Sequence, residues 1–158
     1  MFIRALISFI TLPGIAAVIV PPLITYFDPW SEEHWAPGII VMCIGAFILL
    51  WCVRDFHKSG KGTLAPWDPP GNLVVVGLYR IVRNPMYIGV LLLVLGWSIY
   101  FWSVVLVLYA TILAVGFHIR VVRNEEPWLK AQFGIQWELY QKKVSRWLPR
   151  LTPWQGDS

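Results

Sequence analysis

The distribution of basic residues constrains this chain more than any other feature. All 13 lysines and arginines can be placed on one side of a membrane that four apolar stretches would cross. Arg4 precedes the first stretch, one group of basic residues separates the second from the third, and the rest follow the fourth. The loop after the first stretch carries only acids, Asp28, Glu32 and Glu33. Because positively charged residues favour the cytoplasmic side, four helices with both termini in the cytoplasm are expected.

Composition supports the membrane class. Hydrophobic residues make up 57% and charged residues 14% of the chain, against about half and a quarter in soluble domains. The net charge of +4 is explained by topology and anionic lipid headgroups, so we expect no nucleic-acid partner. The three histidines are scattered without ligand spacing, so no metal site is expected. We expect one integral-membrane domain over residues 1–158, of a kind that suits a bacterial inner membrane.

Apolar runs predict helices over residues 2–26, 37–54, 85–100 and 102–118, the last continuing through Arg123. The first run could be read as a cleaved signal peptide. It continues past Pro21 and Pro22 to Phe27 without a clear small-residue cleavage site, which favours a retained helix. The connection over residues 55–78 is rich in glycine and proline and predicts no regular structure. Connections of this length are usually functional or disordered.

The tail has helical periodicity. Apolar residues recur every three or four positions, at Leu129, Phe133, Trp137, Tyr140, Val144 and Leu148, with polar residues between them. This pattern predicts an amphipathic helix, with a possible break at Gly134, that lies in the membrane interface or packs under the bundle. A soluble coiled-coil partner is the alternative. The expected fold is an all-α polytopic membrane protein with four transmembrane helices and a C-terminal amphipathic interfacial helix.

Two polar motifs flank the last two predicted membrane helices. The segment 77–89 leads into the third helix with arginines, Asn84, Pro85 and tyrosines, and membrane anchoring would explain it equally well. Glu125 and Glu126 follow the fourth helix, where acids also suit a helix start. The two helices form a hairpin that returns the chain to its starting side. We therefore expect the two motifs to meet at the cytoplasmic face, in a mixed site that could hold a zwitterionic cofactor.

The pattern Gly-x-Tyr-Arg-x-x-Arg-Asn-Pro-Met-Tyr-x-Gly, a helical hairpin, then Glu-Glu and Phe-Gly, resembles the isoprenylcysteine carboxyl methyltransferase and phospholipid methyltransferase superfamily. The resemblance covers about residues 73–149. It implies S-adenosylmethionine as cofactor and a cofactor-binding half over about residues 71–150. The pocket residues that it implies, together with Arg83 from its chemistry, are Gly71, Asn72, Leu73, Val74, Tyr79, Arg83, Asn84, Pro85, Met86, Tyr87, Glu125 and Glu126.

The chain departs from the isoprenylcysteine branch at two positions. That branch usually has histidine in place of Asn84, and an arginine four residues before the glutamate, where this chain has Val121. Arg120 and Arg123 flank that position and could substitute only if the helix is rotated or offset. With Glu125 they are the candidate catalytic residues. The missing arginine argues against a carboxylate acceptor.

Residue chemistry suggests individual roles. Glu125 fits the cofactor's ammonium or ribose hydroxyls, and Arg83 fits its carboxylate. Tyr79 and Tyr87 could stack on the adenine or face the sulfonium. The expected function is an S-adenosylmethionine-dependent methyltransferase acting on a lipophilic acceptor: a phospholipid amine, an isoprenylcysteine-like carboxylate or another small amphiphile. The alternative is a non-catalytic membrane protein that keeps the fold to bind a lipid or a partner. A transporter has little support, because the predicted membrane interiors carry no charge.

Overall fold

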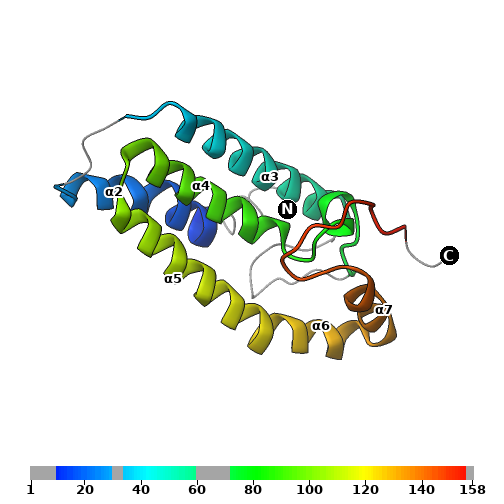
Figure 1. Ribbon diagram of the computed structural model, residues 1–158. Helices are drawn as coiled ribbons and strands as arrows, with labels where there is room; N and C mark the ends of the chain where they lie inside the picture. Colours follow the sequence, from blue (N-terminus) through cyan, green and yellow to red (C-terminus); the bar gives the residue numbers. More distant parts are fainter. Residues whose placement is uncertain (1–9, 30–33, 60–71, 156–158) are drawn as a thin grey trace.

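Helices run side by side along one axis of the molecule (Figure 1). The computed structural model describes residues 10–29, 34–59 and 72–155, and within these ranges every regular element is helical. The order is η1 (Ile10–Ile19), α2 (Val20–Phe27), α3 (Pro37–Ser59), η2 (Gly77–Arg80), α4 (Pro85–Phe101), α5 (Val104–Arg120), η3 (Val121–Glu125), α6 (Glu126–Phe133) and α7 (Ile135–Lys143). The all-α prediction is confirmed for this part of the chain. Arg4, Glu32, Glu33 and Gly71, which the sequence predictions used, lie outside it.

The bounds predicted for the three later helices agree with the observed ones to within a few residues. The connection predicted to lack regular structure is helical at both ends, in the last turn of α3 and in η2. The start of the first predicted helix lies outside the described residues. Two helices, Pro37–Asp55 and Val104–Phe133, are long and apolar enough to cross a membrane. Two shorter apolar helices, Gly14–Phe27 and Pro85–Phe101, lie beside them. Of the four predicted crossings, length and composition thus support two directly, and the full count remains a prediction.

Local chemistry explains the turn between α4 and α5. Pro85 lies in the first turn of α4, where its missing N–H costs no hydrogen bond. Trp102 takes a left-handed conformation with φ +53° and ends α4. The Ser103 hydroxyl then accepts the backbone N–H of Leu106 at 3.3 Å and caps α5. The chain reverses within two residues, as predicted for a helical hairpin.

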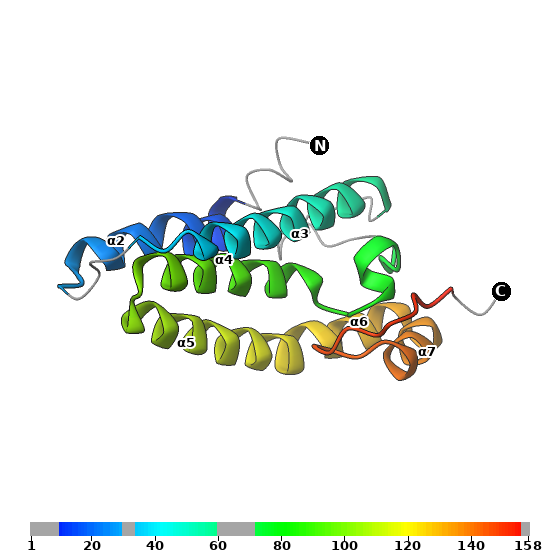
Figure 2. The same ribbon diagram turned by 45° about the horizontal axis from the view of Figure 1, so that its top comes forward.

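The middle helix, α4, lies between α3 and α5 (Figures 1 and 2). Glycines allow the backbones of α3 and α4 to approach closely, with Gly38 facing Gly96 and Gly45 facing Gly89. Small residues at such contacts are a common way to pack helices in a membrane, where lipid and side chains are equally apolar. The close packing fixes α4 against α3 and so determines where Tyr87, two residues into α4, is held.

Gly96→Val is expected to lower the free energy of unfolding in detergent by about 3 kcal/mol, because overfilled contacts strain the backbone. A Cβ atom at Gly96 would lie 2.7 Å from the Met42 nitrogen and 2.9 Å from the Gly38 oxygen. The matched control is Gly116→Val in α5, where a Cβ atom meets nothing within 4 Å. That change should stay within about 0.5 kcal/mol of the parent. Equal losses in the two variants would show that helix propensity, and not close packing, sets the cost.

The N-terminal segment packs against the hairpin. Ala17 is fully buried against a core that includes Val90, Val94 and Ala110. The Trp97 indole donates a hydrogen bond to the Ala17 carbonyl at 3.1 Å. At the same end of the bundle the buried Ser103 hydroxyl donates to Asp28. These contacts hold the described N-terminal helix on the hairpin, away from the two polar motifs.

The predicted amphipathic tail forms two short helices, separated at Gly134, where a break was predicted as possible. Gly134, with φ +50°, separates α6 from α7. Of the predicted apolar face, Trp137, Tyr140 and Val144 form a buried cluster against which Leu129, Phe133, Leu73 and Val75 pack. The tail therefore packs under the bundle, which was one of the two predicted placements. Leu148 does not belong to this face and is 76% exposed, because α7 ends at Lys143.

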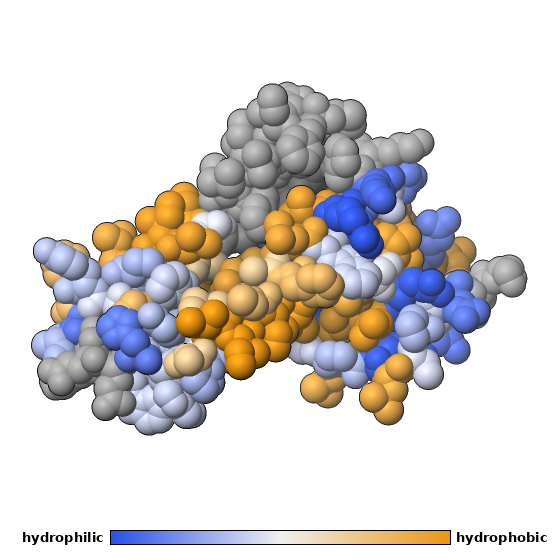
Figure 3. All heavy atoms as spheres, turned by 90° about the horizontal axis from the view of Figure 1, so that it is seen from above, coloured by the Kyte–Doolittle hydropathy of each residue, from blue (hydrophilic) through white to orange (hydrophobic). Residues whose placement is uncertain are grey.

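Apolar residues cover the middle of the face shown in Figure 3, and strongly hydrophilic residues gather most densely at the end that carries the C-terminal segment. Exposed apolar side chains on α3 and α5 include Phe47, Leu50, Leu108 and Ile112. Burying such surface in lipid is favourable, whereas leaving it in water is not. The two polar motifs lie at the hydrophilic end.

Candidate functional site

The two motifs meet, as the hairpin argument predicted. The Tyr87 hydroxyl, at the start of α4, donates a hydrogen bond to Glu125 Oε1 at the end of η3. Arg120 Nε donates to the same oxygen at 2.8 Å. Both bonds end on Oε1, and the described residues donate none to Oε2. The side chains of Arg120 and Glu125 are 38% and 31% exposed, so this cluster of three residues is open to a ligand.

Aromatic rings line the same place. The rings of Tyr87 and Phe117 stack with centroids 4.4 Å apart, and the Trp147 ring lies 6.4 Å from that of Tyr87. The Trp147 indole donates to His118 Nδ1 at 3.1 Å. Flat apolar faces beside a carboxylate and a guanidinium are suited to a molecule that carries both an aromatic base and charged groups.

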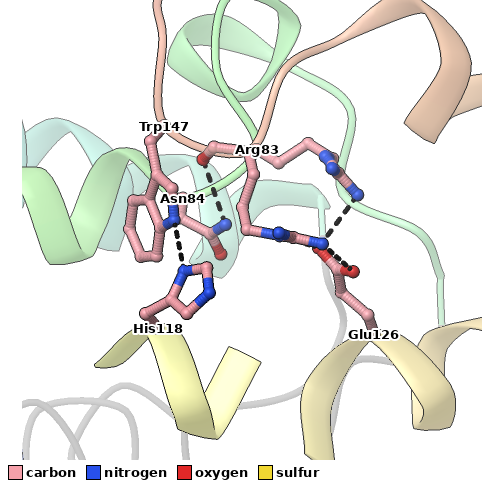
Figure 4. A network of polar contacts seen from close by, with 6 residues as sticks. Arg83, Asn84, His118, Glu126 and Trp147 are labelled. Atoms are coloured by element: carbon pink, nitrogen blue, oxygen red, sulfur yellow. Dashed lines mark hydrogen bonds and ion pairs between the residues drawn. The ribbon is translucent and has the colours of Figure 1, made fainter. Parts of the chain in front are cut away.

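Glu126, next in the chain, belongs to a different cluster. Arg146 binds it through two bonds, Nε to Oε1 at 2.7 Å and Nη2 to Oε2 at 2.8 Å. Arg83 Nη1 lies 3.0 Å from Glu126 Oε1; the charges attract, although their orientation does not satisfy hydrogen-bond geometry. The side chains of Glu126 and Arg83 are 15% and 10% exposed. Figure 4 shows the guanidinium group of Arg83 beside the Glu126 carboxylate.

Burial dominates the electrostatics of Arg83. Loss of water lowers the pKa of its guanidinium and the nearby Arg146 charge lowers it further, while Glu126 opposes both effects. Its guanidinium also lies over the Trp137 ring, 5.4 Å from the centroid. The bidentate bond to Glu126 raises the pKa of Arg146. Glu126 therefore binds two arginines and offsets one of their two positive charges, which is a structural task.

The C-terminal segment lies against the approach to α4. The backbone N–H of Arg83 donates to the Ser145 carbonyl at 2.9 Å, and that of Arg150 donates to the Ile81 carbonyl at 3.1 Å. The Asn84 amide donates to the Arg146 carbonyl at 3.2 Å (Figure 4). Asn84, which was expected to line the cofactor pocket, thus holds the C-terminal segment in place.

The remaining predicted pocket residues lie around this centre. Tyr79 and Val74 are buried together with Cys52, and the Tyr79 carbonyl accepts the Tyr140 hydroxyl at 2.6 Å. Leu73 packs against the Trp137 cluster, Met86 packs against the bundle core, Pro85 is buried and Asn72 is exposed. Arg123 is exposed, and none of the ion pairs between described residues includes it. Whether these residues contact a cofactor stays a prediction.

Val121 occupies the position at which the resemblance implies an arginine, and a π-helical turn begins there. Val121 is 1% exposed and points into the core. Residues 121–125 form a single π-helical turn, which contains one residue more per turn than an α-helix. This offset brings Arg120 onto Glu125, so Arg120 and not Arg123 pairs with the glutamate. The sequence predictions also omitted His118, Arg146 and Trp147, although the similarity of residues 144–149 to the superfamily pointed to the C-terminal segment.

Comparison with known proteins adds a family. A family model described as phospholipid methyltransferase matches residues 34–136. A Schizosaccharomyces pombe protein named protein-S-isoprenylcysteine O-methyltransferase is 32% identical over an alignment that covers 68% of this chain and 46% of the length of that protein. An Arabidopsis thaliana protein named protein-S-isoprenylcysteine O-methyltransferase A is 24% identical over 77% of this chain and 64% of its own. The match thus spans less than two thirds of the length of either relative.

Proposed function

Because this chain belongs to the phospholipid methyltransferase family, we propose that it transfers a methyl group from S-adenosylmethionine to a lipophilic acceptor at the cytoplasmic face of a membrane. The relatives named as isoprenylcysteine O-methyltransferases support methyl transfer to a lipid-linked group. The proposal treats residues 1–158 as one domain, whose cofactor-binding half covers about residues 71–150.

One observation carries this proposal: Tyr87 and Glu125, from two motifs 38 residues apart, share a hydrogen bond at an accessible place. The ion pair between Arg120 and Glu125 is partly exposed, and such pairs contribute little stability, so the fold alone gives little reason for this group of side chains. A ligand-binding role explains such a cluster beside stacked aromatic rings better than a purely structural role does.

The donor set fits S-adenosylmethionine. Glu125 Oε2, which accepts no bond from the described residues, can accept one from an ammonium or a ribose hydroxyl. Arg120 has its Nη groups on a side chain that is 38% exposed, where they can bind a carboxylate. Tyr87, Phe117 and Trp147 offer ring faces for the adenine or the sulfonium. Arg83, by contrast, is engaged with Glu126, so the Nη groups of Arg120 suit an acceptor anion better than those of Arg83 do.

When bound, the cofactor would supply an electrophilic methyl group, and the protein would supply alignment and exclusion of water. Alignment of two reactants is worth several kcal/mol, about 7–11 in favourable intramolecular cases. Glu125, held by Tyr87 and Arg120, would fix the cofactor's polar groups. The aromatic rings would keep water from the reacting centre. The acceptor would enter sideways from the lipid.

Methyl transfer to candidate acceptors tests the proposal. Purified protein in detergent is incubated with methyl-labelled S-adenosylmethionine and either phosphatidylethanolamine or a farnesylated N-acetylcysteine. Label that enters the organic phase and becomes volatile methanol in mild base is a methyl ester on a carboxylate, and label that stays non-volatile in base is on nitrogen. The contact between Arg120 and Glu125 makes Arg120 the better candidate for the role of the arginine missing at Val121, and this supports including a carboxylate acceptor in the test. Absence of transfer to any lipophilic acceptor, in protein that binds the cofactor, would contradict the proposal.

We also propose that four segments cross the membrane, namely residues 2–26, whose last part belongs to α2, and the helices α3, α4 and α5, with both termini in the cytoplasm, as in a bacterial inner membrane. α4 is shorter than α3 and than the continuous helix that begins with α5, which are long enough to cross a membrane. It lies between them and is in close contact with α3. The hydrophilic end that carries the Glu125 cluster would then face the cytoplasm, where the cofactor is found. Reporter fusions at Gln155 and at Trp35 should report opposite sides of the membrane.

The non-catalytic alternative has one observation in its favour. Arg83, Asn84 and Glu126 all have structural partners, so their presence alone does not require catalysis. Variants of Tyr87, Arg120 and Glu125 distinguish the two functions. If the protein is an enzyme, these variants should weaken cofactor binding, whereas a protein that only binds a partner should bind no cofactor at all. Cofactor retention by the purified protein favours the enzyme.

A further inference from the structure

The helix that carries both acids changes its hydrogen-bonding pattern at one point. α5 is α-helical to Arg120, and α6 is α-helical from Glu126. Between them the Glu126 N–H donates to the Val121 carbonyl, five residues earlier, as in a π-helix. An isolated π turn in a long helix corresponds to one inserted residue, because the helix continues unchanged on both sides.

The inserted residue decides which side chains meet. At about 100° per residue, two residues five apart in a regular α-helix lie about 140° apart around the axis. Arg120 and Glu125 are five apart, and yet Nε and Oε1 are 2.8 Å apart. The π turn accounts for this contact. It also leaves Val121, four residues before Glu125, in the core.

We propose that the π turn Val121–Glu125 is a register adjustment that makes Arg120 the positioning residue of Glu125. Arg120 and Tyr87 both bind Oε1 and so fix the rotation of the carboxylate, which directs Oε2 toward the ligand. Arg120 then acts on cofactor binding through Glu125. This inference rests on the proposed function for its ligand, but the register adjustment itself concerns the helix alone.

The register of the following helix depends on the same turn. Glu126 binds Arg83, which precedes α4, and Arg146, which follows α7. Removing one residue from inside the π turn should convert it to α-helix, place Arg120 four residues before the glutamate and leave both partners of Glu126 in reach. Removing one residue from the regular helix above it should rotate everything beyond by about 100° and break both clusters.

Two single-residue deletions test the register. Val122 lies in the π turn and Val115 in α5, and both are exposed valines of the same helix. Deletion of Val122 should leave the melting temperature unchanged, since both contact clusters survive. The affinity for S-adenosylhomocysteine should stay within about threefold of the parent. Deletion of Val115 should lower the melting temperature and lower the affinity by more than about thirtyfold. Equal damage from the two deletions would overturn the proposal.

A second measurement tests the positioning role. Arg120→Gln should weaken S-adenosylhomocysteine binding about tenfold at an unchanged melting temperature, and should have little further effect when Glu125 is already glutamine. Additive effects in the double variant would overturn the positioning role. If the parent binds no S-adenosylhomocysteine, the proposed function fails, while the melting temperatures of the two deletions still decide the register adjustment.

Discussion

Glu125→Gln lowers kcat/KM for methyl transfer by about a hundredfold or more and leaves the melting temperature at the parent value, if Glu125 orients the cofactor. Glutamine keeps the shape of the side chain but loses the charge that Arg120 and a cofactor ammonium recognise. Because the side chains of Glu125 and Arg120 are 31% and 38% exposed, water screens their ion pair, and its loss should cost the fold about 1 kcal/mol or less. Steady-state kinetics and thermal unfolding of the same preparation measure both effects.

The adjacent acid supplies the contrast. Glu125 and Glu126 are neighbours in sequence, so composition and local charge hardly distinguish them. A loss of activity in Glu125→Gln that is matched by an equal loss of stability would contradict the assignment, because it would make Glu125 a structural residue. Retention of full activity would contradict it directly.

Glu126→Gln is expected to lower the free energy of unfolding by about 3 kcal/mol, because removing one partner of a buried ion pair leaves charge uncompensated. Two guanidinium groups, those of Arg83 and Arg146, would then face each other without a carboxylate between them. Arg83 is nine-tenths buried and cannot regain its water without local unfolding. Chemical denaturation in detergent, followed by tryptophan fluorescence, measures the loss.

The matched control is Glu138→Gln. Glu138 pairs with Lys130 at 3.2 Å, but both side chains are exposed, at 43% and 62%. This variant should change the free energy of unfolding by less than about 0.5 kcal/mol. Similar losses for Glu126→Gln and Glu138→Gln would show that the buried cluster has no special structural role.

The helices and their ends could be predicted because their causes are local. Long apolar runs, Pro85 at a helix start and Gly134 between two helices are visible in the sequence. The meeting of Tyr87 and Glu125 also followed, since a two-helix hairpin must bring its ends together. The burial of Trp137 and Tyr140 was consistent with one of two open placements, because periodicity identifies an apolar face but not what covers it.

The division of the site into two clusters could not be predicted in the same way. A π turn has no local sequence signal comparable to a proline or a glycine, so Arg120 could not be paired with Glu125 from spacing alone. Arg146 lies 20 residues from Glu126, and that contact depends on the path of the whole C-terminal segment. Asn84 and Arg83 were expected at the cofactor for their chemistry, but they have protein partners that only the fold brings close.

The central claim is that the Glu125 cluster holds S-adenosylmethionine, and isothermal titration of the detergent-purified protein with S-adenosylhomocysteine tests it most directly. We predict saturable binding at one site per chain, with a dissociation constant on the order of micromolar. The absence of binding heat, in protein that retains its helical circular dichroism and melts cooperatively, would contradict the claim.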